Sequence, residues 1–304
     1  MLGWIGSLRR TAAAPRVAAV APVVPAPAAP PVQPPPPAPT PSALAWLLQG
    51  PPALDQPMSE AENAVLQVLD DHLAADRLPA DLVPRAAGVV PQLLALMRQE
   101  SPSRTVMVQQ VLKDPLLTAE VLRVARSSHY GGRPVDTLDT ALDRIGTIGL
   151  QTATARVLLK PVFQAQGDGL AARAAPRVWH RSEQKSMRCA ELAARTGGDR
   201  FEGLLAGLLH DIGWLALLRL LDRTGLAVVW PASHALDAAL DRRKDALFGR
   251  LAAGWDLGPA LAALATALQQ APLASVNLPL AAALREADAA MGGLPAETAD
   301  AVAA

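Results

Sequence analysis

The chain has 304 residues, of which 51% are hydrophobic and only 3% aromatic, and its 28 basic residues balance its 28 acidic ones. A net charge of zero provides no long-range attraction for nucleic acid or for an anionic membrane, so neither is expected as a partner. The single cysteine, Cys189, excludes an internal disulfide and fits a reducing compartment, which predicts a cytoplasmic location.

The N-terminal residues 1–41 differ from the rest in composition. Between Ala12 and Pro41 nearly every residue is Pro, Ala or Val, and residues 34–37 are four consecutive prolines. Proline lacks an N–H and fixes φ, so the composition predicts a disordered, extended tail over residues 1–41. A proline-rich ligand for a partner protein is the open alternative. The charges at the start follow the apolar residues, which does not indicate a secretory signal.

The remaining sequence predicts consecutive helices, because no run alternates in the way that strands do. Ser59 and Glu62 have the spacing of a capping box, which predicts a helix from there to about residue 75. Asp114-Pro115 is a second start signal, with Asp as the cap and Pro at the first helical position. Further helices are expected over 82–98, 106–112, 138–145, 150–159, 174–195, 201–221, 233–254, 258–270 and 278–291, with Gly146 as a stop between two of them.

The stretch 203–221 is apolar on every side, which predicts a helix at the centre of the domain. His210 and Asp211 lie in the middle of it. An imidazole and a carboxylate are costly to bury unless they are hydrogen-bonded, paired or bound to a metal ion. They would also lie near the middle of a bilayer, so no transmembrane span is expected.

Five segments occur in an order that resembles the HDOD family, an all-helical relative of the HD phosphohydrolases. They are 111–128, which contains Asp114-Pro115-Leu116, then 135–146, Trp179-His180-Arg181-Ser182, the run Gly207-Leu-Leu-His-Asp-Ile-Gly213, and Trp255-Asp256-Leu257. Arg126 stands where the family usually has Asn, and Gly258 where it usually has Pro.

The resemblance implies an all-α, HD-like domain of two helical lobes over residues 81–293. The first lobe is expected over 81–162 and the second, HD-like lobe over 170–293. A helical lead-in (42–80) would connect the domain to the disordered Pro/Ala-rich tail, and a short C-terminal tail (294–304) would follow it.

HD enzymes bind a divalent metal ion through a His, a His-Asp pair and a later Asp. The resemblance places these ligands at His180, His210, Asp211 and Asp288. Such an ion would activate a water molecule against a phosphate ester.

The relatives that hold two metal ions have further histidines, where this chain has Asp245 and Gln269-Gln270. With five histidines in the whole chain, a His-rich binuclear site is hard to build. Arg173, Arg177 and Arg181 fall at helical spacing and could contact phosphate near His180, and residues 242–244 form a short basic cluster. For both groups a solvated face is the favoured expectation.

Two functions stay open. The first is a bacterial signal-transduction or regulatory module that binds a protein partner or a ligand, with a degenerate HD site, no catalytic residue, no cofactor and no turnover. In that case the four site residues would bond to one another and tie helices together. The alternative is a metal-dependent phosphohydrolase that uses a divalent ion on a nucleotide or cyclic dinucleotide. HDOD domains are generally regarded as signalling modules, which favours the first.

Overall fold

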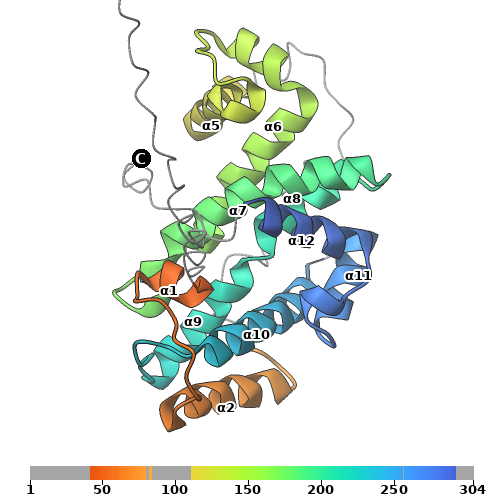
Figure 1. Cartoon of the computed structure of the whole chain (residues 1–304). Coiled ribbons are helices and arrows are strands. Elements are labelled where there is room, and N and C mark those ends of the chain that lie inside the picture. Colours follow the sequence, from red (N-terminus) through yellow and green to blue (C-terminus); the bar gives the residue numbers. More distant parts are fainter. Residues whose placement is uncertain (1–41, 80–81, 84–110, 256, 292–304) are drawn as a thin grey trace, which may run out of the picture. The chain divides into compact units, whose positions relative to one another are not determined.

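The computed structural model describes residues 42–79, 82–83, 111–255 and 257–291 (Figure 1). Within these ranges the regular elements are helices, apart from one isolated parallel bridge between Leu54 and Ser233. The predicted all-α fold class is therefore confirmed. All the described residues belong to one compact unit. The predicted tails and most of the helices predicted over 82–98 and 106–112 lie outside the described residues.

Ten α-helices and two 3₁₀ helices lie in the described ranges. They are α1 (Ala43–Leu48), α2 (Glu60–Ala74), α5 (Pro115–Arg126), η1 (Ser128–Tyr130), α6 (Leu138–Phe163), α7 (Leu170–Arg195), α8 (Arg200–Leu209), α9 (Ile212–Thr224), α10 (His234–Ala252), α11 (Pro259–Leu268), η2 (Leu273–Ser275) and α12 (Pro279–Ala290).

Several helices begin at the side chains that the sequence marked. The Glu62 carboxylate accepts the Ser59 N–H at 2.7 Å, and the Ser59 hydroxyl accepts the Glu62 N–H at 3.2 Å, which completes the capping box. The Asp114 carboxylate accepts the N–H groups of Leu116 and Leu117 at 2.9 and 3.2 Å. Both predicted helix starts are confirmed, because capping involves residues within one turn of each other.

Gly146 interrupts α6, as predicted. The backbone there has φ 58° and ψ −163°, a conformation that glycine adopts without the steric cost of a Cβ. The helices on either side of Gly146 pack with α5 around a small apolar core, whose buried members include Val121, Val124 and Ile145.

The larger core surrounds α8 and α9 and corrects the prediction of one continuous helix over 201–221. α8 ends at Leu209 and α9 begins at Ile212. Between them the hydrogen bonding tightens, because the Trp214 N–H donates to the Asp211 carbonyl at 3.0 Å, three residues back. By length and composition the stretch Arg200–Thr224 could cross a membrane, but 94% of its apolar window is buried inside the protein. Its composition therefore reflects its central position.

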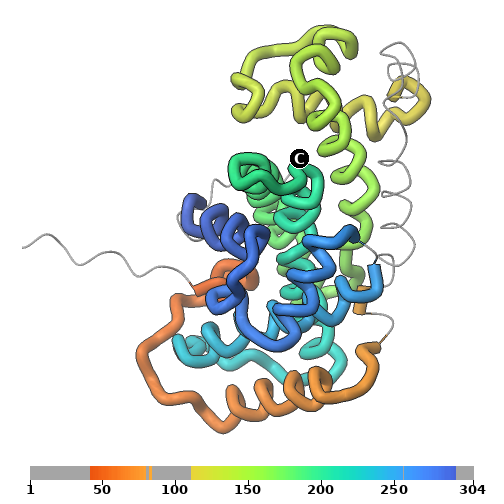
Figure 2. Tube along the Cα trace, turned by 90° about the vertical axis from the view of Figure 1, so that its right-hand side faces the viewer, coloured from red at the N-terminus to blue at the C-terminus, as the bar shows by residue number. Residues whose placement is uncertain are grey.

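The long helix α7 packs along α8, α9 and α12, and α10 packs against α9, α11 and α2 (Figures 1 and 2). Three helices, α7, α10 and α12, thus pass close to the α8–α9 junction. Side chains from all of them converge there.

Candidate functional site

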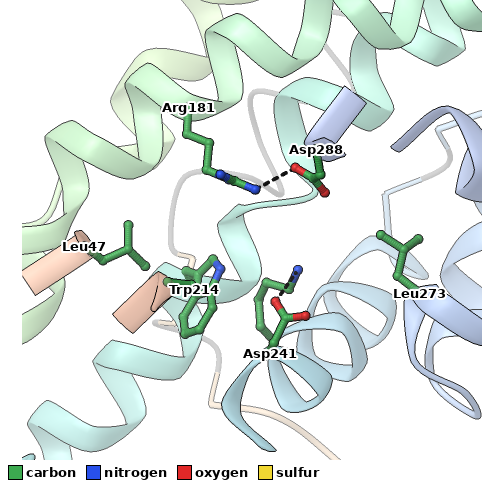
Figure 3. A pocket seen from close by; sticks show the side chains of 8 residues that line it. Leu47, Arg181, Trp214, Asp241, Leu273 and Asp288 are labelled. Atoms are coloured by element: carbon green, nitrogen blue, oxygen red, sulfur yellow. Dashed lines mark hydrogen bonds and ion pairs between the residues drawn. The ribbon is translucent and has the colours of Figure 1, made fainter. Parts of the chain in front are cut away.

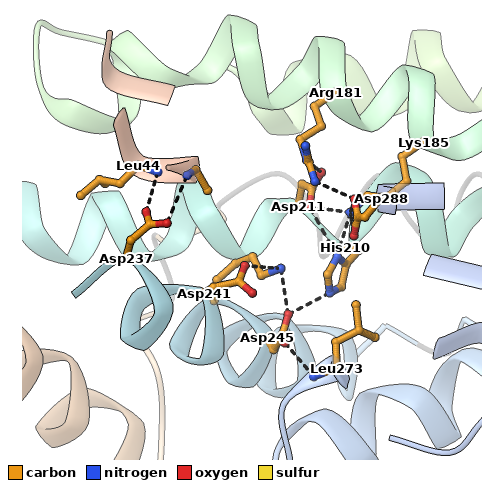
Figure 4. Close-up of polar contacts among 12 residues, drawn as sticks. Leu44, Arg181, Lys185, His210, Asp211, Asp237, Asp241, Asp245, Leu273 and Asp288 are labelled. Atoms are coloured by element: carbon orange, nitrogen blue, oxygen red, sulfur yellow. Dashed lines mark hydrogen bonds and ion pairs between the residues drawn. The ribbon is translucent and has the colours of Figure 1, made fainter. Parts of the chain in front are cut away.

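A group of charged side chains is buried at the α8–α9 junction, and we call it the charged cluster (Figure 4). Most of its members are less than 5% exposed, a depth at which charges need partners. The cluster consists of His210 and Asp211 at the junction, Arg181 and Lys185 of α7, Lys244 and Asp245 of α10, and Asp288 of α12.

Lys185 lies at the centre of the charged cluster and is fully buried. Its Nζ is 2.8 Å from Oδ1 of Asp211, 3.1 Å from Nδ1 of His210 and 3.1 Å from Oδ1 of Asp288. An ammonium group has three N–H donors and no acceptor, so these three partners satisfy it completely. Three of the four predicted metal ligands therefore surround the lysine nitrogen.

The contact with Lys185 fixes the tautomer of His210. Because the ammonium can only donate, Nδ1 of His210 is the acceptor and the ring proton is on Nε2. That Nε2–H donates to Oδ1 of Asp245 at 3.0 Å, and the other oxygen of Asp245 accepts the Leu273 N–H at 2.8 Å. The Nδ1 lone pair, which a metal ion would use, is thereby taken by Lys185.

Arg181 is the second cation on this face of α7. Its Nη2 is 2.6 Å from Oδ1 of Asp288, and its Nε is 3.2 Å from Oδ2 of Asp211. The side chain is only 14% exposed, so the prediction that Arg181 belongs to a solvated face is wrong. One arginine thus bridges two carboxylates that the sequence assigned to a metal ion.

Neighbouring cations determine the ionisation of the buried carboxyl groups. Burial raises the pKa of Asp211, but Lys185, His210 and Arg181 together outweigh it and hold that pKa well below its usual range. Burial likewise raises the pKa of Asp245, and Lys244 and His210 together outweigh it and lower the pKa. For Lys244 itself burial lowers the pKa, yet Asp241 and Asp245 bring it above its usual range. In formal charge, three cations (Arg181, Lys185, Lys244) face three carboxylates (Asp211, Asp245, Asp288).

His180 does not join the charged cluster. Its Nε2 lies 2.9 Å from Nε2 of Gln184, on a different face of α7 from Arg181 and Lys185. Successive residues of a helix are rotated by about 100°, whereas residues four apart share a face. The structure therefore brings together His210, Asp211 and Asp288, but not His180.

The arrangement does not fit a divalent ion, because Lys185 Nζ takes the point on which the donors converge. Among the described residues, no group of three or more His, Cys, Asp or Glu side chains is arranged to hold a metal ion. Asp245 is committed to His210, and Gln269 donates to the backbone carbonyls of Gly249 and Ala265 at 3.2 and 3.3 Å. Metal binding at the four predicted ligands stays a prediction.

The sequence did contain a signal that Lys185 is buried. The signal is the position of this residue on α7 and not its residue type. The buried face of α7 includes Val178, Ser182, Ser186 and Cys189, and Lys185 falls within this stripe. A lysine on the buried face of an amphipathic helix breaks the pattern and needs a buried partner.

A cavity of about 190 Å³ adjoins the charged cluster (Figure 3). Two ion pairs lie in its wall, Arg181 with Asp288 and Lys244 with Asp241. The remaining lining residues are Ala43 and Leu47 of α1, Trp214 of α9 and Leu273 of η2.

Solved structures of similar fold come from two bacteria. One, from Shewanella amazonensis SB2B, is named a "putative metal-dependent phosphohydrolase"; it is 18% identical, with a TM-score of 0.56 over 79% of this chain and 86% of the other. Another, an HDOD domain protein of unknown function from Geobacter sulfurreducens, is 19% identical, with a TM-score of 0.50 over 78% and 83% of the two chains. At these identities the likeness concerns the fold alone.

Family membership rests on the sequence comparison. No curated protein matches this chain significantly. The sequence model of the HDOD domain matches residues 83–271, which is more than half of the chain. The chain therefore belongs to the HDOD domain family.

Proposed function

We propose that this chain is a bacterial signalling or regulatory module that acts in the cytoplasm by binding a protein partner or a ligand. In this proposal Lys185, and not a metal ion, holds its HD-type site together. The observation that carries the proposal is the position of the Lys185 ammonium between His210, Asp211 and Asp288.

The charge of the site supports this proposal. A divalent ion between Asp211 and Asp288 would have to displace Lys185, which has no exposed surface, and would replace one positive charge by two in a cluster whose three cations already face three carboxylates. Uncompensated buried charge is strongly unfavourable. Phosphoester hydrolysis in HD enzymes needs a Lewis acid to activate water, and an ammonium group has no coordination position to offer.

The connections made by the charged cluster support a structural role in binding. Lys185 and Arg181 of α7 join Asp211 before α9 and Asp288 of α12, and His210 joins Asp245 of α10. Buried polar contacts with satisfied partners define the relative positions of helices. Helices that are held in fixed positions present a constant surface, which suits recognition of a partner.

The second candidate is a metal-dependent phosphohydrolase acting on a nucleotide or cyclic dinucleotide. The name of the Shewanella protein favours it, as does the convergence of His210, Asp211 and Asp288 on one point. This candidate requires Lys185 to leave that point.

Metal analysis combined with a hydrolysis assay separates the two candidates. The purified protein should contain far less than one transition metal ion per chain. It should also show no turnover of bis-p-nitrophenyl phosphate, nucleotides or cyclic dinucleotides with added manganese, nickel or iron.

Two folded variants, His210→Ala and Asp211→Asn, provide the matched control. A stoichiometric metal ion, together with hydrolysis that scales with protein concentration and vanishes in both variants, would establish the phosphohydrolase. Weak activity that persists in both variants would come from a contaminant and would not contradict the proposed binding module.

A further inference from the structure

We infer that α1 is a detachable cover over one side of the cavity beside the charged cluster. The inference goes beyond the proposed function, because it concerns access to the cavity and not what the site binds or whether it holds a metal ion. It rests on how α1 is seated, how its two ends are held and what lies beneath it.

The apolar face of α1 faces inwards. Leu44, Leu47 and Leu48 are 0, 1 and 2% exposed, and their spacing places them on one side of a helix. α1 contacts α7 and α10, the two helices that supply the lysines and Arg181 of the charged cluster. Leu47 also forms part of the cavity wall, so the same face seats the helix and forms one side of the cavity (Figure 3).

One side chain from each of these helices holds one end of α1. The carboxylate of Asp237, on α10, accepts the N–H groups of Ala43 and Leu44 at 3.3 and 3.0 Å (Figure 4). At the other end, Arg173 of α7 donates to the Leu48 carbonyl at 2.9 Å. A carboxylate at a helix N-terminus and a cation at its C-terminus both complement the helix dipole.

The chain turns directly after α1. Gln49 ends the helix in the left-handed region, with φ 56°. A Cβ on Gly50 would lie 2.5 Å from the Trp230 ring, so glycine permits the close passage there. The next residues, 51–52 and 54–56, are largely exposed and precede α2. α1 can therefore leave its seat without moving α2.

α1 is a short helix whose structure depends on its seat. Six residues are too few for a stable isolated helix, so its folding depends on docking. The cavity beneath Ala43 and Leu47 deprives α1 of part of the packing that a filled interface would provide. A single element can open locally without global unfolding of the domain. Opening would expose Arg181 and Asp288 to an incoming ligand.

Thiol labelling measures this opening, because the native cysteine is expected to react very slowly. Its only cysteine, Cys189, is fully buried, and burial raises the pKa of its thiol to about 12. In the Ala45→Cys variant a thiol replaces a methyl group that is 3% exposed on α1. We expect this thiol to react with a water-soluble disulfide reagent at least ten times faster than Cys189 under native conditions.

A second reporter thiol and a matched pair of substitutions test whether α1 covers the cavity. Leu273→Cys places a thiol on another wall of the cavity, outside α1. Adding Asp237→Ala should accelerate labelling of both reporters by the same factor, about tenfold or more, and leave the Cys189 rate unchanged. Asp241→Ala is the control, because Asp241 lies on the same helix and lines the cavity but pairs with Lys244. It should accelerate neither reporter.

Three results would each overturn the inference. The Ala45→Cys thiol could react no faster than Cys189, which would mean that α1 opens only with the whole fold. Asp237→Ala could accelerate Cys189 equally, which would make Asp237 a general support of the fold. The Leu273→Cys thiol could fail to respond, which would mean that α1 does not cover the cavity. Circular dichroism checks that each variant is folded, and no metal ion is needed, so the result is independent of the proposed function.

Discussion

The Nζ of Lys185 lies 2.8 Å from Oδ1 of Asp211, and neither side chain is more than 1% exposed. At this depth each charge is tolerable only because the other is present. The pair joins the middle of α7 to the start of α9, so it sets the geometry of the site at which the family resemblance predicted a metal ion.

Removing the cation should destabilise the fold. Lys185→Met leaves Asp211 and Asp288 with one cation fewer, and breaking a buried pair costs about 3–5 kcal/mol of unfolding free energy. Urea denaturation measures this loss. Arg188→Met, at an exposed position on the same helix, should change stability by no more than about 0.5 kcal/mol. The double variant Lys185→Met/Asp211→Leu should lose less than the sum of its single variants, and strict additivity would show that the two charges are not coupled.

The same lysine should control metal binding. In Lys185→Ala, Nδ1 of His210 and the carboxylates of Asp211 and Asp288 would converge on an empty position, with two cations left against three carboxylates. Manganese or zinc should then raise the melting temperature of Lys185→Ala but not that of the wild-type protein, because a ligand stabilises only the state that binds it. Adding His210→Ala should abolish the effect. An equal response of wild type and variant would contradict Lys185 as the occupant of the metal position.

Stability should fall in acid through Asp211 and Asp245. Both have a folded-state pKa below the usual range, so as the pH falls below about 4 the unfolded chain takes up protons before the folded protein does. Their contribution is therefore full above about pH 4 and is lost below it. Denaturation midpoints between pH 3 and 7 should show this decline in the wild type. Asp245→Asn should be less stable at pH 7 and decline less steeply, and parallel curves would exclude Asp245 as a source.

Two truncations should distinguish the contribution of the N-terminal tail to thermal stability from that of α1. Deleting residues 1–38, which precede the compact unit, should leave the melting temperature unchanged. Deleting residues 1–49 should lower it by several degrees, because the chain loses Leu44, Leu47 and Leu48, each worth about 1.5–3 kcal/mol when fully buried. Scanning calorimetry of the two truncated proteins makes the comparison. A large loss in the shorter deletion would show that the tail packs on the domain.

The residue pattern was sufficient to predict the all-α class, the helix starts at Ser59 and Asp114, and the interruption at Gly146. Each depends on atoms within about one helical turn, so the local residue pattern is sufficient. The apolar surroundings of His210 and Asp211 also predicted their burial.

Tertiary structure alone decided what these two residues contact. His210 bonds to Asp245, 35 residues further on, and Asp211 bonds to Lys185, 26 residues earlier. On α7 a shift of one residue rotates a side chain by about 100°, which is why Arg181 and not His180 faces the carboxylates. The rotation of a helix about its own axis is set by the packing of its whole buried face, and no single motif contains that information.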